Sequence, residues 1–252
     1  MLESFKKAIF RALCLCCVLI GGGGLMASQT PKELFDLGVK SNKAKDYIKA
    51  KKYFEKACNL NYGGGCFSLG FLYTNKDFGE KNYKKALALM TKGCELNYAL
   101  GCGFLGNLYT NNGLINGPMV KKDLRKATQY YSKACELNLG VSCSLLGFLY
   151  QNGNGVKKDL KKAFALYAKA CGLKDGDGCL RLGEMQRSGE GVVKNREQAM
   201  KNFKKGCELK NKLACMGYKA TIAEIMNERC QLGDEVTCVY LNNLLDLFDI
   251  DE

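Results

Sequence analysis

Twelve cysteines form six pairs of identical spacing, and their thiols are the side chains of this chain best suited to chemistry. Seven residues separate the two members of every pair. The pairs are Cys58 and Cys66, Cys94 and Cys102, Cys135 and Cys143, Cys171 and Cys179, Cys207 and Cys215, and Cys230 and Cys238. Cysteines in such a pattern form either disulfides or metal sites. The chain has 15 cysteines, and if Cys14, Cys16 and Cys17 leave with an N-terminal signal, all twelve that remain are paired and no thiol is left to act as a nucleophile.

Metal coordination is the weaker of the two alternatives. Zinc-binding cysteines usually stand two to four residues apart and are joined by a second such pair or by histidines. The pairs here are spaced more widely, and the chain contains no histidine. We therefore expect disulfides, with neither a metal nor another cofactor.

The elements around each pair are predicted to be two antiparallel helices. The first cysteine ends an apolar stripe at helical spacing, as in Leu160, Ala163, Tyr167, Ala170 and Cys171. The second cysteine is expected to begin the next helix, and in four copies Leu-Gly follows it. Two helices joined by a short turn bring their ends to the Cα separation of a disulfide, about 5.5–6 Å. Each cysteine should therefore bond to its near neighbour.

The pairs recur with a period that is typical of stacked helix-turn-helix repeats. Successive first cysteines lie 36, 41, 36, 36 and 23 residues apart. We predict an all-α solenoid, with residues 28–252 forming a single domain. Its expected repeats are 31–61, 62–97, 98–138, 139–174 and 175–210. A degenerate region, 211–252, should follow and should end in a capping helix at 236–248, for which a role in contacting a bilayer or a partner is the alternative.

Export is predicted from the first 27 residues. Basic residues precede an apolar run at 12–20, and Leu25-Met-Ala27 offers a small-residue cleavage site. The apolar run is too short to span a bilayer, so no transmembrane segment is expected after cleavage. Cys14, Cys16 and Cys17 should leave with the signal, although a lipoprotein anchor is an alternative. A secreted or periplasmic location also agrees with the predicted disulfides.

The net charge of +13 is carried by lysines that recur at fixed repeat positions. They include the pairs at 84–85, 121–122, 157–158, 161–162 and 204–205. A solvated helix face is the simplest interpretation, and attraction of acidic surface polymers or anionic membranes is the alternative. Nucleic acid is not an expected partner, because no nucleic-acid-binding module is recognisable.

Two sets of repeat positions could line a groove. Nine residues after the second cysteine stand Asn75, Asn111, Asn152 and Ser188. Five residues after it stand Phe71, Asn107, Phe148 and Glu184. Helix capping is the alternative for the first set, since Asn152 and Ser188 each precede a glycine. Ordinary surface exposure is the alternative for the second, and Tyr73, Tyr109 and Tyr150 are expected to pack in the core.

Residues 146–171 resemble a known repeat. They read Leu-Gly-Phe-Leu-Tyr, then Gly-Asn-Gly-Val-Lys-Lys-Asp-Leu-Lys-Lys-Ala, then Leu-Tyr-Ala-Lys-Ala-Cys. This pattern resembles the Sel-one-like repeat, a relative of the tetratricopeptide repeat. The paired cysteines narrow the resemblance to the secreted Helicobacter cysteine-rich proteins. The resemblance implies a right-handed superhelix and weak binding or hydrolysis of β-lactams.

No catalytic residue is predicted from the chain itself. A serine β-lactamase needs a serine with a lysine three residues later, and Ser4 with Lys7 is the only such pair. Three hypotheses follow: a monomeric scaffold whose concave groove binds a peptide or protein, a weak β-lactam hydrolase, and a surface protein that binds anionic polymers.

Overall fold

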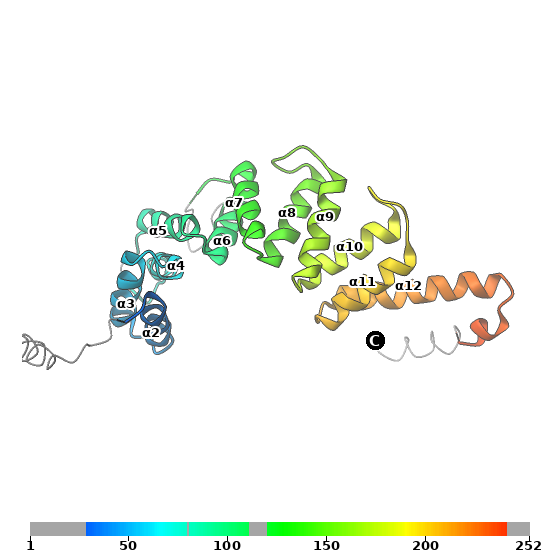
Figure 1. Cartoon of the computed structure of the whole chain (residues 1–252), viewed down its shortest axis with the longest axis horizontal. Helices are drawn as coiled ribbons and strands as arrows, with labels where there is room; N and C mark the ends of the chain where they lie inside the picture. The colour runs from blue at the N-terminus through cyan, green and yellow to red at the C-terminus, as the bar shows by residue number, and fades with distance from the viewer. Residues whose placement is uncertain (1–28, 80, 111–119, 241–252) are drawn as a thin grey trace, which may run out of the picture.

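The computed structural model describes residues 29–79, 81–110 and 120–240, and its elements there are all helical. The helices are α2 (Pro31–Lys43), α3 (Tyr47–Asn59), α4 (Gly63–Leu72), α5 (Tyr83–Glu95), α6 (Ala99–Thr110), α7 (Leu124–Glu136), α8 (Gly140–Asn152), α9 (Leu160–Gly172), α10 (Gly176–Ser188), α11 (Arg196–Glu208) and α12 (Lys212–Gln231). Helix pairs stack side by side into an arched rod (Figure 1). The predicted all-α solenoid is confirmed.

The second helix of each pair starts at a side-chain cap and buries one apolar stripe. In α9 the carboxylate of Asp159 accepts a hydrogen bond from the backbone N–H of Lys162 at 2.9 Å. The residues that α9 buries are Ala163, Tyr167, Ala170 and Cys171. Asp46, Asn82, Asp123 and Asn195 cap α3, α5, α7 and α11 in the same way. These caps fix where each stripe begins.

The first helix of each pair begins earlier than the sequence predicted. We expected it to start at the second cysteine, but α10 starts at Gly176, three residues before Cys179. The reason is a very tight turn: Lys174 takes a left-handed φ of 63°, and the N–H of Asp175 bonds to the carbonyl of Ala170 at 3.0 Å. This Schellman geometry ends α9 and lets the next helix begin at once.

Glycine ends two of the first helices, as predicted. Gly153 after α8 and Gly189 after α10 have φ values of 71° and 80°. L-residues with a Cβ rarely adopt this conformation, so glycine suits both positions. The equivalent glycine of the longer repeat, Gly113, lies outside the described residues.

The Leu-Gly signature marks close contact between the two helices of a repeat. A Cβ atom at Gly147 would lie 2.8 Å from the ring of Tyr167, and one at Gly183 would lie 2.7 Å from the ring of Phe203. Both rings are almost completely buried. The glycine therefore provides the space in which an aromatic side chain of the second helix fills the core.

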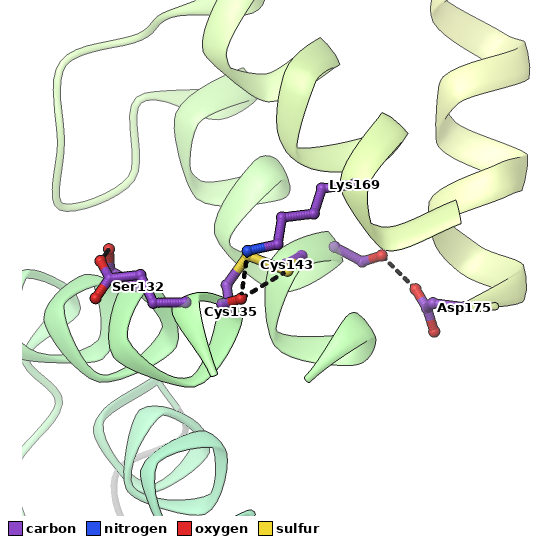
Figure 2. Close-up of a disulfide and its surroundings, with 7 residues drawn as sticks. Ser132, Cys135, Cys143, Lys169 and Asp175 are labelled. Atoms are coloured by element: carbon purple, nitrogen blue, oxygen red, sulfur yellow. Dashed lines mark hydrogen bonds between the residues drawn. A yellow bond between two sulfur atoms is a disulfide. The ribbon is translucent and has the colours of Figure 1, made fainter. Parts of the chain in front are cut away.

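Within the residues that the structure describes, each of the twelve cysteines is bonded to its partner eight positions along the chain, giving six disulfides. The Cα–Cα distances run from 4.4 Å at Cys207–Cys215 to 4.8 Å at Cys230–Cys238, the short end of the usual range. Figure 2 shows the Cys135–Cys143 bridge, whose Cys135 carbonyl also accepts a hydrogen bond from Lys169 Nζ at 2.7 Å. The side chain of α9 thus helps to cap the end of α7.

The pattern changes at the C-terminal end. Cys215 and Cys230 both belong to α12, a single helix of 20 residues, so this copy contains no helix-turn-helix. The last bridge ties the end of α12 to the helical residues 235–240. The predicted signal at 1–27 and most of the predicted capping helix lie outside the described residues. Within the described part, no helix is both long enough and apolar enough to cross a membrane.

Candidate functional site on the concave face

The first helices of the repeats line the inner side of the arch. Contacts between alternate helices join α2 to α4, α4 to α6, α8 to α10 and α10 to α12. Helices that approach one another in this way lie on the shorter, inner side of a curved stack. We call the surface formed by α4, α6, α8, α10 and α12 the concave face.

A row of apolar side chains runs along the concave face. Leu100, Val141 and Leu213 each stand two residues before the second cysteine of their repeat. They are 52%, 55% and 60% exposed. Three aligned apolar side chains at this exposure form a surface that a partner could cover.

A small cavity of ≈ 200 Å³ opens on the concave face between α8, α10 and α12, with Tyr167 of α9 also in its wall. We call it the central notch. Its lining includes Val141, Phe148 and Leu213, together with Ser144, Asp175, Asp177 and Arg181. Leu145 and Leu180 also line it, so the notch combines apolar side chains with nearly as many polar groups, and a ligand there would meet both kinds of surface.

Polar groups in the central notch are held by hydrogen bonds. Ser144 Oγ donates to Asp175 Oδ2 (Figure 2, dashed line at Asp175). The same Asp175 oxygen accepts from the N–H of Gly178 at 2.9 Å and so caps α10. Arg181 pairs with Glu184 at 2.9 Å. Ser144 and Asp175 therefore hold each other in place, whereas the Arg181–Glu184 pair lies at the exposed rim of the notch.

Tyr167 closes the base of the notch as a neutral hydrogen-bond donor. Its hydroxyl donates to Gln151 Oε1 at 2.8 Å. Burial raises the pKa of Tyr167 to about 12, so the phenol stays protonated at neutral pH. It donates to Gln151, and because it stays protonated it cannot serve there as a general base.

The raised pKa predicts a loss of stability at alkaline pH. Unfolded tyrosine ionises near pH 10, whereas the folded pKa of Tyr167 is about 12. The contribution of the protonated Tyr167 hydroxyl to the free energy of unfolding is therefore fully present below about pH 10, and it is lost as the pH rises from there toward 12. In Tyr167→Phe the free energy of unfolding should therefore decline less with rising pH than in wild type, by at most about 2–3 kcal/mol. Denaturant unfolding of both proteins at pH 8 and pH 11.5 measures it, and equal declines would contradict the assignment.

The positions five residues after the second cysteine lie on the concave face with different surroundings. Phe148 is 44% exposed and lines the central notch. Phe71 is 47% exposed and packs edge-on against Phe104, with ring centroids 6.0 Å apart. Phe71 also borders a cavity of ≈ 140 Å³ together with Asn75. Asn107 accepts a hydrogen bond from Tyr131, and Glu184 pairs with Arg181.

The positions nine residues after the second cysteine make local bonds. Asn152 Nδ2 donates to the carbonyl of Phe148 at 2.8 Å, and Ser188 Oγ donates to the carbonyl of Glu184 at 2.9 Å. Asn75 Oδ1 accepts from the N–H of Asp77 at 3.0 Å. Such bonds satisfy the ends of helices and turns. Asn111 lies outside the described residues.

Apart from Phe148, the sequence did not predict the residues that line the notch. Ser144 and Asp175 are 31 positions apart, and nothing in their spacing indicates that they meet. Leu100, Val141 and Leu213 could have been predicted, because an apolar residue recurs two positions before the second cysteine of the pair. Tyr73 is buried as expected, whereas Tyr109 and Tyr150 are only half-buried.

Similar proteins are known from Helicobacter pylori. "Putative beta-lactamase HcpC" is 60% identical over 73 residues, which is 29% of this chain and 24% of that protein. "Beta-lactamase HcpA" is 48% identical over 73 residues, which is 29% of this chain and 28% of that protein. The matched part therefore spans about a quarter of the length of these curated relatives.

Two solved structures share the fold, and a family model covers most of the chain. A Sel1 repeat protein from Oxalobacter formigenes has a TM-score of 0.65 at 23% identity, covering 96% of this chain and 97% of its own. The protective antigen c5321 of uropathogenic Escherichia coli has a TM-score of 0.68 at 22% identity, covering 86% of this chain and 49% of its own. The Sel1 repeat model matches residues 34–62, 64–98, 99–139, 140–175 and 176–211. This chain therefore belongs to the Sel1 repeat family.

Proposed function

We propose that this protein is a binding scaffold that holds an extended segment of a partner protein along its concave face. The observation that carries the proposal is the row of exposed apolar side chains at Leu100, Val141 and Leu213. They come from three of four successive cysteine-linked helix junctions, and the remaining junction, between those of Val141 and Leu213, carries Asp177 at this position. A linear partner could contact them in sequence. The six disulfides support a location outside the reducing cytosol.

The size of the central notch favours a side chain over a whole small molecule. Pockets that enclose drug-sized ligands usually measure about 300–1,000 Å³, and the notch measures ≈ 200 Å³. A single apolar side chain of a peptide would fit against Val141, Phe148 and Leu213. The peptide backbone could then bond to polar groups at the rim, such as Asp177 and Arg181.

An aspartate in the notch should abolish most of this binding. Val141→Asp places an unpaired charge where an apolar anchor would be desolvated, so affinity should fall at least about tenfold. Peptides would first be selected from a random library on the oxidised protein, and their dissociation constants would then be measured by calorimetry. Ile48→Asp is the matched control, because Ile48 is 82% exposed on α3, away from the concave face.

Two results would contradict the scaffold. One is that Val141→Asp and Ile48→Asp bind the selected peptides equally well. The other is that no peptide can be selected on the oxidised protein under conditions in which its circular dichroism shows the folded state.

A weak β-lactam hydrolase is the second candidate. Its support is the name of HcpA and the Ser144–Asp175 hydrogen bond, which gives the concave face one oriented hydroxyl. However, Asp175 already caps α10 through Gly178, and Ser144 is only 8% exposed. An activated serine needs a base that can take its proton and a substrate that can reach it.

Turnover of a chromogenic cephalosporin separates the two candidates. We expect wild type and Ser144→Ala to give the same rate, no higher than that of the cephalosporin in buffer without protein. A rate that drops at least about tenfold on loss of the Ser144 hydroxyl would favour the hydrolase over the scaffold.

A further inference from the structure

Most of the net positive charge of this chain is concentrated in three short segments, 81–86, 121–127 and 157–163. They contain eleven basic and two acidic residues, a net charge of +9 against +13 for the whole chain. Each segment spans the start of a second helix, namely α5, α7 or α9. We call the surface formed by these three segments the basic edge.

Packing places neighbouring segments of the basic edge next to one another. A Cβ on Gly155, just before the third segment, would lie 2.5 Å from the backbone of Leu124 in the second. Val156 packs against the core cluster that contains Ala127 and Tyr131 of α7. Val120, just before the second segment, packs against the cluster that contains Met90 of α5. The basic segments therefore follow one another along the side of the stack.

The placement of these charges opposes helix stability. The amino end of a helix carries partial positive charge, so acidic residues stabilise the first turn and basic residues destabilise it. The first turns of α5, α7 and α9 contain no acidic residue. They contain instead Lys84 and Lys85, Arg125 and Lys126, and Lys161 and Lys162. Local propensity does not explain this arrangement, which is a sign of function.

The two acidic residues of the basic edge are engaged by backbone groups. Asp123 accepts from the N–H groups of Arg125 and Lys126, each at 3.1 Å, and Asp159 accepts from that of Lys162. Both side chains act as helix caps and so face the backbone.

The lysines around these caps are available to a ligand. Lys121, Lys157, Lys158 and Lys161 are exposed. None of these four forms an ion pair with a residue that the structure describes.

The third segment lines an open cleft of ≈ 870 Å³. Lys157, Lys158, Lys161 and Lys162 converge on it, with Asp159 the one carboxylate among its lining residues. Tyr150 holds Lys162 in place: the ammonium lies 2.7 Å from the hydroxyl and 4.2 Å from the ring centroid. Similar lysine–tyrosine contacts join Lys126 to Tyr109 and Lys85 to Tyr73. One ammonium group of each segment is thus held against a tyrosine ring.

The equivalent cleft of the next repeat has a mixed charge and does not belong to the basic edge. It measures ≈ 540 Å³ and is lined by Lys194, Arg196 and Arg229, but also by Glu197 and Glu228. Arg196 pairs with Glu228 at 2.5 Å. Here two acidic residues offset most of the charge of the three basic ones, so we place the end of the basic edge at α9.

From this distribution we propose that the basic edge binds a linear sulfated polysaccharide. A row of lysine clusters that continues over three repeats suits a thread-like polyanion whose charges repeat along its length. A membrane surface is a poorer match, because the apolar side chains Val156 and Leu160 pack against core clusters and no large apolar side chain of the three segments is exposed for insertion. Base recognition in nucleic acid favours arginine, and this edge has one arginine among ten lysines.

Heparin is the probe for this proposal. Binding of the oxidised protein to heparin would be measured by calorimetry at 0.15 M salt for wild type and for the triple variant Lys121→Glu, Lys157→Glu, Lys161→Glu. Affinity should fall at least about tenfold. The melting temperature should not fall, because the variant places acidic residues near helix amino ends. Val141→Asp should bind heparin like wild type, so this test is independent of the concave face.

The matched control carries the same charge change elsewhere. Lys201→Glu, Lys204→Glu, Lys212→Glu alters three exposed lysines of α11 and α12 and should change heparin affinity by no more than about twofold. Equal losses in the two triple variants would overturn the basic edge as a site. Tighter binding of wild type to phosphatidylserine vesicles or duplex DNA than to heparin would overturn the polysaccharide as its ligand.

Discussion

Phe203→Ala should lower the free energy of unfolding by about 3–5 kcal/mol. The Phe203 side chain is 1% exposed. It lies between two glycines, where Cβ atoms at Gly183 and Gly217 would stand 2.7 and 2.9 Å from its ring. Both α10 and α12 therefore contact this ring through glycines, which have no side chain. Neither α10 nor α12 has a side chain at these points to refill the cavity, so the cost should lie near the upper end of the range.

Phe148→Ala is the control for this prediction. The same atoms are removed, but Phe148 is 44% exposed on the concave face. Its loss should cost no more than about 1 kcal/mol. Guanidinium chloride unfolding of the oxidised proteins measures both, and equal shifts of the two midpoints would show that the glycine–aromatic contact is not a major source of stability.

Removing the Cys171–Cys179 bridge should be the second large effect. The double variant Cys171→Ala, Cys179→Ala opens a loop whose ends are 8 residues apart. Chain entropy alone predicts a loss of about 2–3 kcal/mol. The two side chains are also buried, at 3% and 0% exposure, so their replacement leaves a small void. The measured loss should therefore equal or exceed the entropic value.

The same double replacement at Cys230 and Cys238 provides a comparison. This bridge spans the same 8 positions, but both cysteines are only partly buried, at the end of the stack. Its removal should cost less than that of Cys171–Cys179 and should leave the midpoint of the central repeats unchanged. A smaller loss at Cys171–Cys179 would contradict the view that the bridges support a tightly packed junction.

The repeat period and the cysteine spacing were sufficient to predict the fold. Seven intervening residues accommodate the last residue of one helix, a turn of three and the first three residues of the next, as at 172–178. The start of the first helix was predicted three residues too late. The tight turn before it depends on a left-handed residue, and lysine, which stands there as Lys174, rarely adopts that conformation. Asn61, Asn97 and Asn138 occupy the same position in other copies, and asparagine is the stronger signal.

The candidate site could be predicted less completely from the sequence than the fold could. Phe148 was predicted from its place in the repeat, but the central notch depends on how three helices stack. Ser144 approaches Asp175 because α8 packs beside α10, a contact set by curvature rather than by any local pattern. The basic edge was visible as lysine pairs, whereas its continuity became apparent only from the packing of Gly155 on Leu124.

Hydrogen exchange of the oxidised protein, with and without a selected peptide, tests the central claim most directly. The scaffold predicts that protection increases on α8, α10 and the first turns of α12, around Val141, Phe148 and Leu213. Protection confined to the second helices, or to the basic edge at 121–127 and 157–163, would contradict a binding site on the concave face.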